Sequence, residues 1–95
     1  MTEINPRNLV HHELIGLEVE VSSSKDPSHK KVKGQIIDET RNMILIEKDS
    51  GRRAMIPKAP STFTFKLPDG RRILVEGRLI IGRPEERLKR RERSW

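Results

Sequence analysis

The chain contains no cysteine. This absence excludes disulfides, thiol nucleophiles and zinc sites built on thiolates. It also fits a reducing compartment, so we expect a cytoplasmic protein. No stretch approaches the ~20 apolar residues that a membrane span needs. The first residues do not combine a basic start with an apolar run, so we expect no signal peptide.

Hydrophobic and aromatic residues are also scarce. Hydrophobic residues make up 33% of the chain and charged residues 36%, and a chain of 95 residues forms one domain at most. These proportions predict a small core with polar ends. The aromatic residues are Phe63, Phe65 and Trp95. Both Phe residues fit the interior of a sheet, so the surface is poorly supplied with rings on which bases could stack.

Positive charge is the feature in excess. Twenty Lys and Arg residues against 14 acidic ones give a net charge of +6. Such a surface favours polyanions, because each phosphate contact releases counterions. A merely well-solvated surface would have the same composition, so charge alone leaves both interpretations open.

The middle of the chain has the apolar–polar alternation of half-buried strands. Leu17, Val19 and Val21, for example, are separated by single glutamates. The pattern predicts strands at 17–21, 32–38, 43–47, 53–57, 63–67 and 72–76, followed by a short apolar run at 79–81. Short strands joined by turns favour a closed antiparallel β-barrel, with an open meander as the alternative.

Several small residues mark turns and bends. The sequence Pro68-Asp69-Gly70 predicts a hairpin. Asn42 is a candidate for a positive φ in the tight segment 39–42. Gly34 suits a strand that bends sharply.

The two ends of the chain have helical patterns. We therefore predict an N-terminal helical arm at 1–16, a barrel at 17–82 and a basic C-terminal helix or tail at 83–95. Leu9, Val10, Leu14 and Ile15 form the apolar stripe of the arm. The tail carries six of the 20 basic residues.

No catalytic constellation is evident. His11, His12 and His29 are the only histidines, and the adjacent pair would point about 100° apart on a helix. The neighbouring acids Asp38 and Glu39 would diverge at a strand end. The chain lacks the metalloprotease, P-loop and nucleophile-elbow motifs. We expect neither a catalytic site nor a bound metal in this chain.

Two ordered segments resemble a known family. Residues 34–42, GQIIDETRN, are followed in the same chain by residues 83–91, RPEERLKRR. Together they resemble protein component 1 of archaeal ribonuclease P, which is related to the Sm-like subunit of the eukaryotic enzyme. The resemblance covers about residues 8 to 93.

The resemblance implies an Sm-like, SH3-like twisted β-barrel flanked by short N- and C-terminal helices. It implies a protein subunit of ribonuclease P that binds the specificity domain of the catalytic RNA and assists removal of 5′ leaders from precursor tRNA. Catalysis would belong to that RNA with divalent ions such as magnesium. The protein partner would be the zinc-ribbon subunit, bound as a heterodimer, and the isolated chain would be a monomer without membrane contact.

The resemblance also indicates candidate residues. RNA contacts are expected from Thr40, Arg41 and Asn42 and from the tail residues Arg83, Arg87, Lys89, Arg90 and Arg91. Arg52, Arg53 and Lys58 are further candidates on charge alone. The expected interface with the partner protein comprises Leu9, Val10, Leu14, Ile15, Val32 and Gln35.

Two other classes remain open at this point. One is a ring-forming Sm-like RNA-binding protein unrelated to tRNA processing. Pro57 and Pro60 argue against the continuous strand pairing that such a ring needs. The other is an independent nuclease, which the missing catalytic groups disfavour.

Overall fold

A computed structural model describes residue 9, residues 12–83 and residues 85–87. Six strands lie at or close to the predicted positions. They are β1 (Glu18–Ser24), β2 (Lys33–Glu39), β3 (Met43–Lys48), β4 (Arg53–Pro57), β5 (Ser61–Lys66) and β6 (Arg72–Glu76). Two 3-10 helices, η2 (Pro27–His29) and η3 (Gly77–Ile80), complete the elements. The predicted antiparallel β fold is confirmed.

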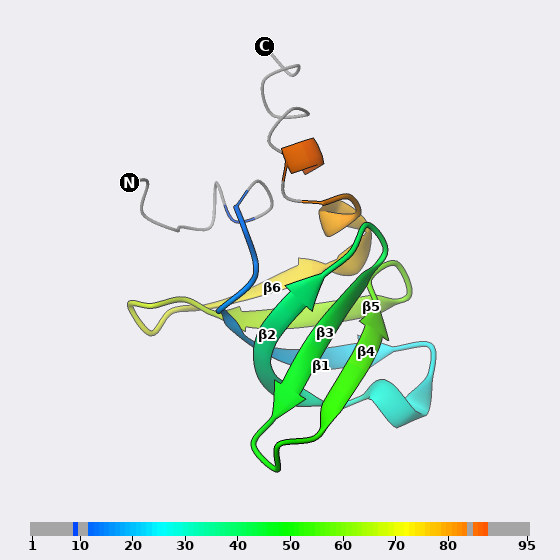
Figure 1. The fold of residues 1–95 in the computed structure, drawn as a ribbon. Helices are drawn as coiled ribbons and strands as arrows, with labels where there is room; N and C mark the ends of the chain where they lie inside the picture. Colours follow the sequence, from blue (N-terminus) through cyan, green and yellow to red (C-terminus); the bar gives the residue numbers. More distant parts are fainter. Residues whose placement is uncertain (1–8, 10–11, 84, 88–95) are drawn as a thin grey trace.

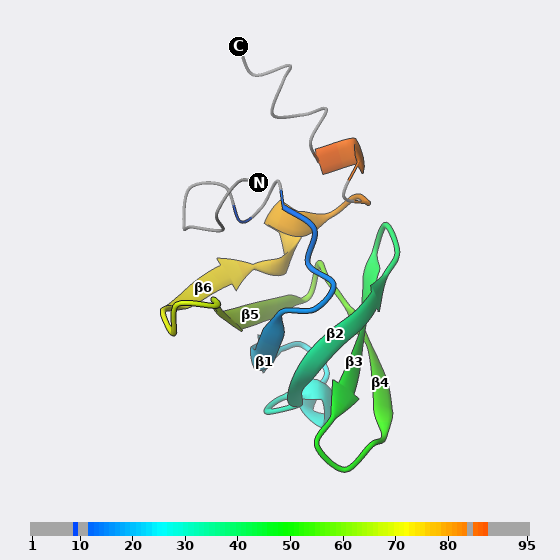
Figure 2. The ribbon, with the colours of Figure 1, turned by 60° about the vertical axis from the view of Figure 1, so that its left-hand side comes forward.

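The strands form one antiparallel sheet in the order β4-β3-β2-β1-β5-β6. Figure 1 shows β2, β3 and β4 upright and β1, β5 and β6 running across them. The sheet therefore bends over its own face in the manner of a small barrel (Figure 2). In the described part of the chain its two edge strands are β4 and β6.

The core fills the concave side of this sheet. Val19 lies opposite Phe65 and Val21 opposite Phe63 in the pairing of β1 with β5. The two Phe rings lie 6.1 Å apart and are fully buried, as their alternation predicted. The aliphatic side chains of β2, β3 and β4 close the other half of the core.

Gly34 lies where β2 passes closest to β3. A Cβ at this position would overlap the backbone of Glu47 and Lys48. Gly34 is paired with Lys48 in the sheet, so any side chain would push the two strands apart. This close approach is the physical reason for the glycine that the sequence indicated.

One extra residue in β2 changes which side chains face the core. Ile36 pairs with Ile46, but Asp38 pairs with Leu45 and Glu39 with Ile44, so a β-bulge lies between Ile36 and Asp38. The bulge shifts the alternation by one residue. Glu39 is consequently buried, where strict alternation from Ile36 would have placed it outside.

The N-terminal segment differs from the prediction where it is described. Leu9 and Leu14 are fully buried members of the core, and residues 12–16 form a bend and a turn. The remainder of the predicted arm lies outside the described residues. The apolar run at 79–81 belongs largely to η3. At the other terminus, residues 85–87 are helical.

Two further observations concern the backbone. The prediction of a positive φ at Asn42 is wrong, because Lys31, at +69°, is the described non-glycine residue with that geometry. No helix within residues 12–83 and 85–87 is long and apolar enough to cross a membrane.

Candidate nucleic-acid interface

Three charged side chains meet inside one end of the molecule. Lys58 and Arg87 are 0% exposed and Glu39 is 7% exposed. The Glu39 carboxylate accepts a hydrogen bond from Lys58 Nζ at 2.6 Å and two from Arg87, at 2.5 Å from Nη1 and 3.2 Å from Nη2. We call these three residues the buried charge cluster.

Backbone carbonyl oxygens also surround the two basic side chains of the buried charge cluster. Lys58 donates to the carbonyls of Thr40 at 2.9 Å and Gly82 at 2.9 Å. Arg87 donates to the carbonyls of Gly82 at 2.6 Å and His12 at 2.8 Å. These dipoles stabilise buried cations that would otherwise be strongly unfavourable.

Local structure brings the three residues together. The bulge in β2 turns Glu39 inward, and Lys58 follows directly after β4. Gly77 opens η3, and a Cβ there would overlap the backbone carbonyl of Lys58, so only glycine lets η3 pack this closely. The helical turn at 85–87 brings Arg87 back over η3.

This arrangement corrects two of the predicted RNA contacts. Lys58 and Arg87 were expected to bind phosphate, but both side chains are fully buried against Glu39. A cation with no exposed surface cannot reach a phosphate group on another molecule. Their role is to fix the backbone around them.

The backbone that they fix carries other predicted RNA contacts. Arg41, Asn42 and Arg83 are exposed and Thr40 is half-buried. The N–H of Gly82 donates to the carbonyl of Arg41 at 2.7 Å, which joins the β2–β3 turn to the segment before Arg83 (Figure 1). We call this surface, made of Thr40, Arg41, Asn42 and Arg83, the β2–β3 end. The predicted contacts Lys89, Arg90 and Arg91 lie outside the described residues.

Arg52 and Arg53 lie at the opposite end of the molecule, at the β3–β4 turn (Figures 1 and 2). Both are exposed, and Arg53 Nε lies 3.5 Å from Glu47 Oε2. The structure therefore divides the predicted RNA contacts between two separate ends.

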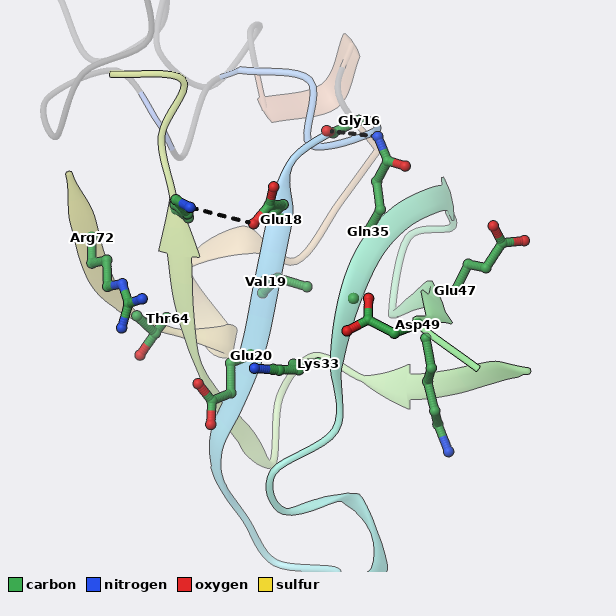
Figure 3. A pocket seen from close by; sticks show the side chains of 13 residues that line it. Gly16, Glu18, Val19, Glu20, Lys33, Gln35, Glu47, Asp49, Thr64 and Arg72 are labelled. Carbon is green, nitrogen blue, oxygen red and sulfur yellow. Dashed lines mark hydrogen bonds and ion pairs between the residues drawn. The ribbon is translucent and has the colours of Figure 1, made fainter. Parts of the chain in front are cut away.

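An open groove of about 630 Å³ crosses the outer face of β1 and β2 (Figure 3). Acidic and basic side chains line it in equal number. They are Glu18, Glu20, Glu47 and Asp49 on one hand and Lys33, Lys48, Lys66 and Arg72 on the other. This balance suits a polar protein surface better than a phosphate chain.

Some residues predicted for the partner interface lie in the core, and others lie on the surface. Leu9 and Leu14 belong to the core, so their prediction as interface residues is wrong. Val32 is half-buried and packs against the same core. Ile15 is 42% exposed and Gln35 lines the groove, its amide donating to the Gly16 carbonyl at 3.1 Å. Val10 lies outside the described residues.

Within the described residues, no three His, Asp or Glu side chains come together as metal ligands could. The buried carboxylate of Glu39 already accepts hydrogen bonds from two cations. The arrangement therefore offers binding surfaces and a fixed backbone.

The family model of ribonuclease P/MRP subunit p29 matches residues 7–90. The chain belongs to this family. Membership of the p29 family also favours a ribonuclease P subunit over the ring-forming Sm-like alternative.

Members of the p29 family from archaea are similar over nearly their whole length. The chain is 50% identical over 88 residues to ribonuclease P protein component 1 of Methanocaldococcus jannaschii, covering 93% of this chain and 92% of that protein. It is 48% identical over 93 residues to the Thermofilum pendens protein of the same name, covering 98% and 99%. A solved structure described as Mth11, a homologue of human RNase P protein Rpp29, matches with a TM-score of 0.59 and 41% identity, over 79% of this chain and 96% of that one.

Sequence reasoning missed the role of Glu39 in this p29-family chain. Its partners lie 19 and 48 residues away along the chain, so no local pattern joins them. The one available signal was an acidic residue next to the last apolar positions of a strand, which is a weak indication of burial.

Proposed function

We propose that this chain is a protein subunit of ribonuclease P that binds the RNA of that enzyme and assists 5′-leader removal from precursor tRNA. The observation that carries the proposal is the p29 family match over residues 7–90. The β2–β3 end supports it, because exposed Arg41 and Arg83 are held there by backbone that the buried charge cluster fixes. A fixed surface loses less conformational entropy when it binds.

RNA recognition would depend on the phosphate backbone and on shape. Phe63 and Phe65 are both fully buried, so residues 12–83 offer no exposed Phe, Tyr or Trp ring for stacking. Arginine suits phosphate because its planar fork donates two parallel hydrogen bonds. In this proposal, catalysis belongs to the RNA with divalent ions such as magnesium, and the chain positions the specificity domain of that RNA.

The partner protein would be the zinc-ribbon subunit of ribonuclease P. It would cover the mixed-charge groove, with exposed Ile15 and Gln35 at its border. In the absence of that partner and of RNA, the chain would be a monomer, and its compartment would be the cytoplasm.

Reconstitution with ribonuclease P RNA and the other protein subunits tests this function. The double variant Arg41→Gln and Arg83→Gln removes two exposed charges from the β2–β3 end. It should decrease the log–log salt slope of RNA affinity by about 1–2 and require more protein for the same precursor tRNA cleavage. The matched control is Arg71→Gln with Arg78→Gln, at exposed positions outside the mixed-charge groove.

Equal losses in both double variants would show a general charge effect and remove the β2–β3 end from the RNA interface. Failure of the unmodified chain to bind ribonuclease P RNA above an unrelated RNA, or to increase cleavage, would refute the proposed function itself.

A further inference from the structure

The end of the molecule opposite the β2–β3 turn carries a group of basic side chains, most of them exposed. It combines the β1–β2 loop, which contains η2, with the β3–β4 turn. Both lie at the lower end in Figures 1 and 2. Its basic residues are Lys30, Lys31, Lys33, Lys48, Arg52 and Arg53, of which Lys33 and Lys48 also line the mixed-charge groove. We call this surface the β3–β4 end.

Strand pairing makes these residues one surface rather than two separate loops. Gly34 pairs with Lys48, so Lys33 at the start of β2 lies next to the last residue of β3. Lys48 is in turn joined to the β3–β4 turn, since its N–H donates to the Arg52 carbonyl at 2.8 Å. The basic residues of β2, β3 and the turn are therefore continuous.

Acidic residues neutralise only part of this charge. Six basic residues face four acidic ones, Glu20, Asp26, Glu47 and Asp49, which leaves a net charge of +2. Arg53 is paired with Glu47, and Lys33 lies opposite Glu20 in the sheet. No described acidic side chain lies within ion-pair distance of Lys30, Lys31 or Arg52.

The backbone presents these cations in a defined arrangement. Asp26 caps η2 by accepting from the Ser28 N–H at 2.9 Å. The Lys31 N–H donates to the Val21 carbonyl at 2.9 Å, and the Lys30 N–H donates to the Pro27 carbonyl at 3.2 Å. The lysines therefore extend from a hydrogen-bonded loop, which favours contact with a regularly spaced polyanion over diffuse screening.

We propose that the β3–β4 end is a second RNA-binding surface, which contacts a different segment of RNA from the β2–β3 end. This inference rests on the function proposed above. The two ends are separated by the length of β3, six residues or about 20 Å at the usual rise per residue. One chain thereby bridges two phosphate-rich segments and holds them at a fixed separation.

Charge removal at the β3–β4 end provides the first test. The full chain with Lys30→Gln and Arg52→Gln is compared with Arg71→Gln and Arg78→Gln, which loses the same charge at exposed positions outside the mixed-charge groove. The probe is ribonuclease P RNA. The first double variant should decrease the log–log salt slope by about 1–2, and the control double variant should not. Thermal melts of both variants check that each remains folded.

Directed cleavage of the RNA provides the second test, and the absence of native cysteine makes it simple. An iron chelate is attached to Ser50→Cys at the β3–β4 turn or to Asn42→Cys at the β2–β3 turn, both exposed positions. The hydroxyl radicals should cut two different segments of the bound ribonuclease P RNA.

The outcomes separate this inference from the proposed function. If the unmodified chain binds the RNA, but the Lys30→Gln and Arg52→Gln variant matches its control and the Ser50→Cys chelate cuts nothing above background, the second surface is refuted and the function stands. Loss of binding to the protein subunits with unchanged RNA binding would assign the surface to an acidic protein and overturn the inference. If the unmodified chain does not bind ribonuclease P RNA, the proposed function fails first.

Discussion

The two ends of this small sheet use positive charge in opposite ways. At the β2–β3 end, Lys58 and Arg87 are buried against Glu39 and fix the backbone of a turn. At the β3–β4 end, Lys30, Lys31 and Arg52 are exposed and contact no described acidic side chain. Lysine and arginine therefore have structural roles at one end of the sheet and are available for binding at the other. The comparison shows that a count of cations does not locate a binding surface.

The strongest test of the buried end is Glu39→Gln. This change keeps the shape of the side chain but leaves two buried cations without their carboxylate. Breaking a buried ion pair by removing one partner costs about 3–5 kcal/mol. We expect a loss of that size in the free energy of unfolding, measured by urea denaturation.

The control for this change is Glu18→Gln. Glu18 is exposed and lies 3.9 Å from Lys66, so its ion pair should contribute less than about 1 kcal/mol. Similar losses for both variants would show that the buried charge cluster does not stabilise the β2–β3 end.

The N-terminal segment provides the next test, because Leu14 is fully buried and its neighbour Ile15 is 42% exposed. Leu14→Ala should lower the free energy of unfolding by about 2–5 kcal/mol through lost burial and a cavity. Ile15→Ala should change it by no more than about 0.5 kcal/mol. Thermal unfolding of the two variants measures these changes in stability. A stable Leu14→Ala chain that fails to bind its protein partner would return Leu14 to the interface.

A smaller effect is expected from Arg87→Lys. Lysine keeps the positive charge but loses the two-pronged contact with Glu39 and the bond to the His12 carbonyl. We expect a loss of about 1–3 kcal/mol, with faster amide exchange at residues 40–42 and 82. Exposed Arg78→Lys serves as the matched control. Unchanged amide exchange at residues 40–42 would show that Arg87 does not fix the backbone of the β2–β3 turn.

The smallest effect is expected at the exposed β3–β4 end, from Asp26→Asn. Hydrogen bonds from the hydroxyl and the backbone N–H of Ser28 lower the pKa of Asp26 from its ordinary value. Because the pKa is lower in the folded chain, the ionised carboxylate stabilises the fold above about pH 4 and loses this contribution as the pH falls through the folded pKa.

Asparagine can still cap η2 but cannot ionise. The difference in stability between the two chains should therefore be small at pH 7 and vanish in acid, as followed by denaturation at a series of pH values. The same change removes a negative charge from the β3–β4 end, so RNA affinity should rise slightly. A decrease in affinity would count against that surface.

The fold was largely accessible from the sequence because alternation is a local property. All six strands were predicted, since each apolar side chain signals its own burial regardless of distant partners. The bulge at residues 36–38 was not predicted, because one extra residue leaves the surrounding pattern of apolar residues almost unchanged. Its consequence, the inward Glu39, was missed with it.

The candidate site was only partly accessible. Arg41 and Arg83 were predicted as RNA contacts and are exposed at one end, whereas Lys58 and Arg87 were assigned to the surface and are buried. A basic residue in sequence looks the same in either role, because its burial depends on a carboxylate brought near by the fold. Leu9 and Leu14 show the converse, since apolar residues predicted to face a partner protein pack on the chain's own core.

The buried charge cluster also has a consequence for shortened forms of the chain. The last strand ends at Glu76, whereas the last member of the cluster is Arg87. A chain cut just before Arg87 would retain all six described strands and lose the guanidinium that joins His12 to Gly82. Such a product would lack the contact that ties the segment before β1 to the segment after η3.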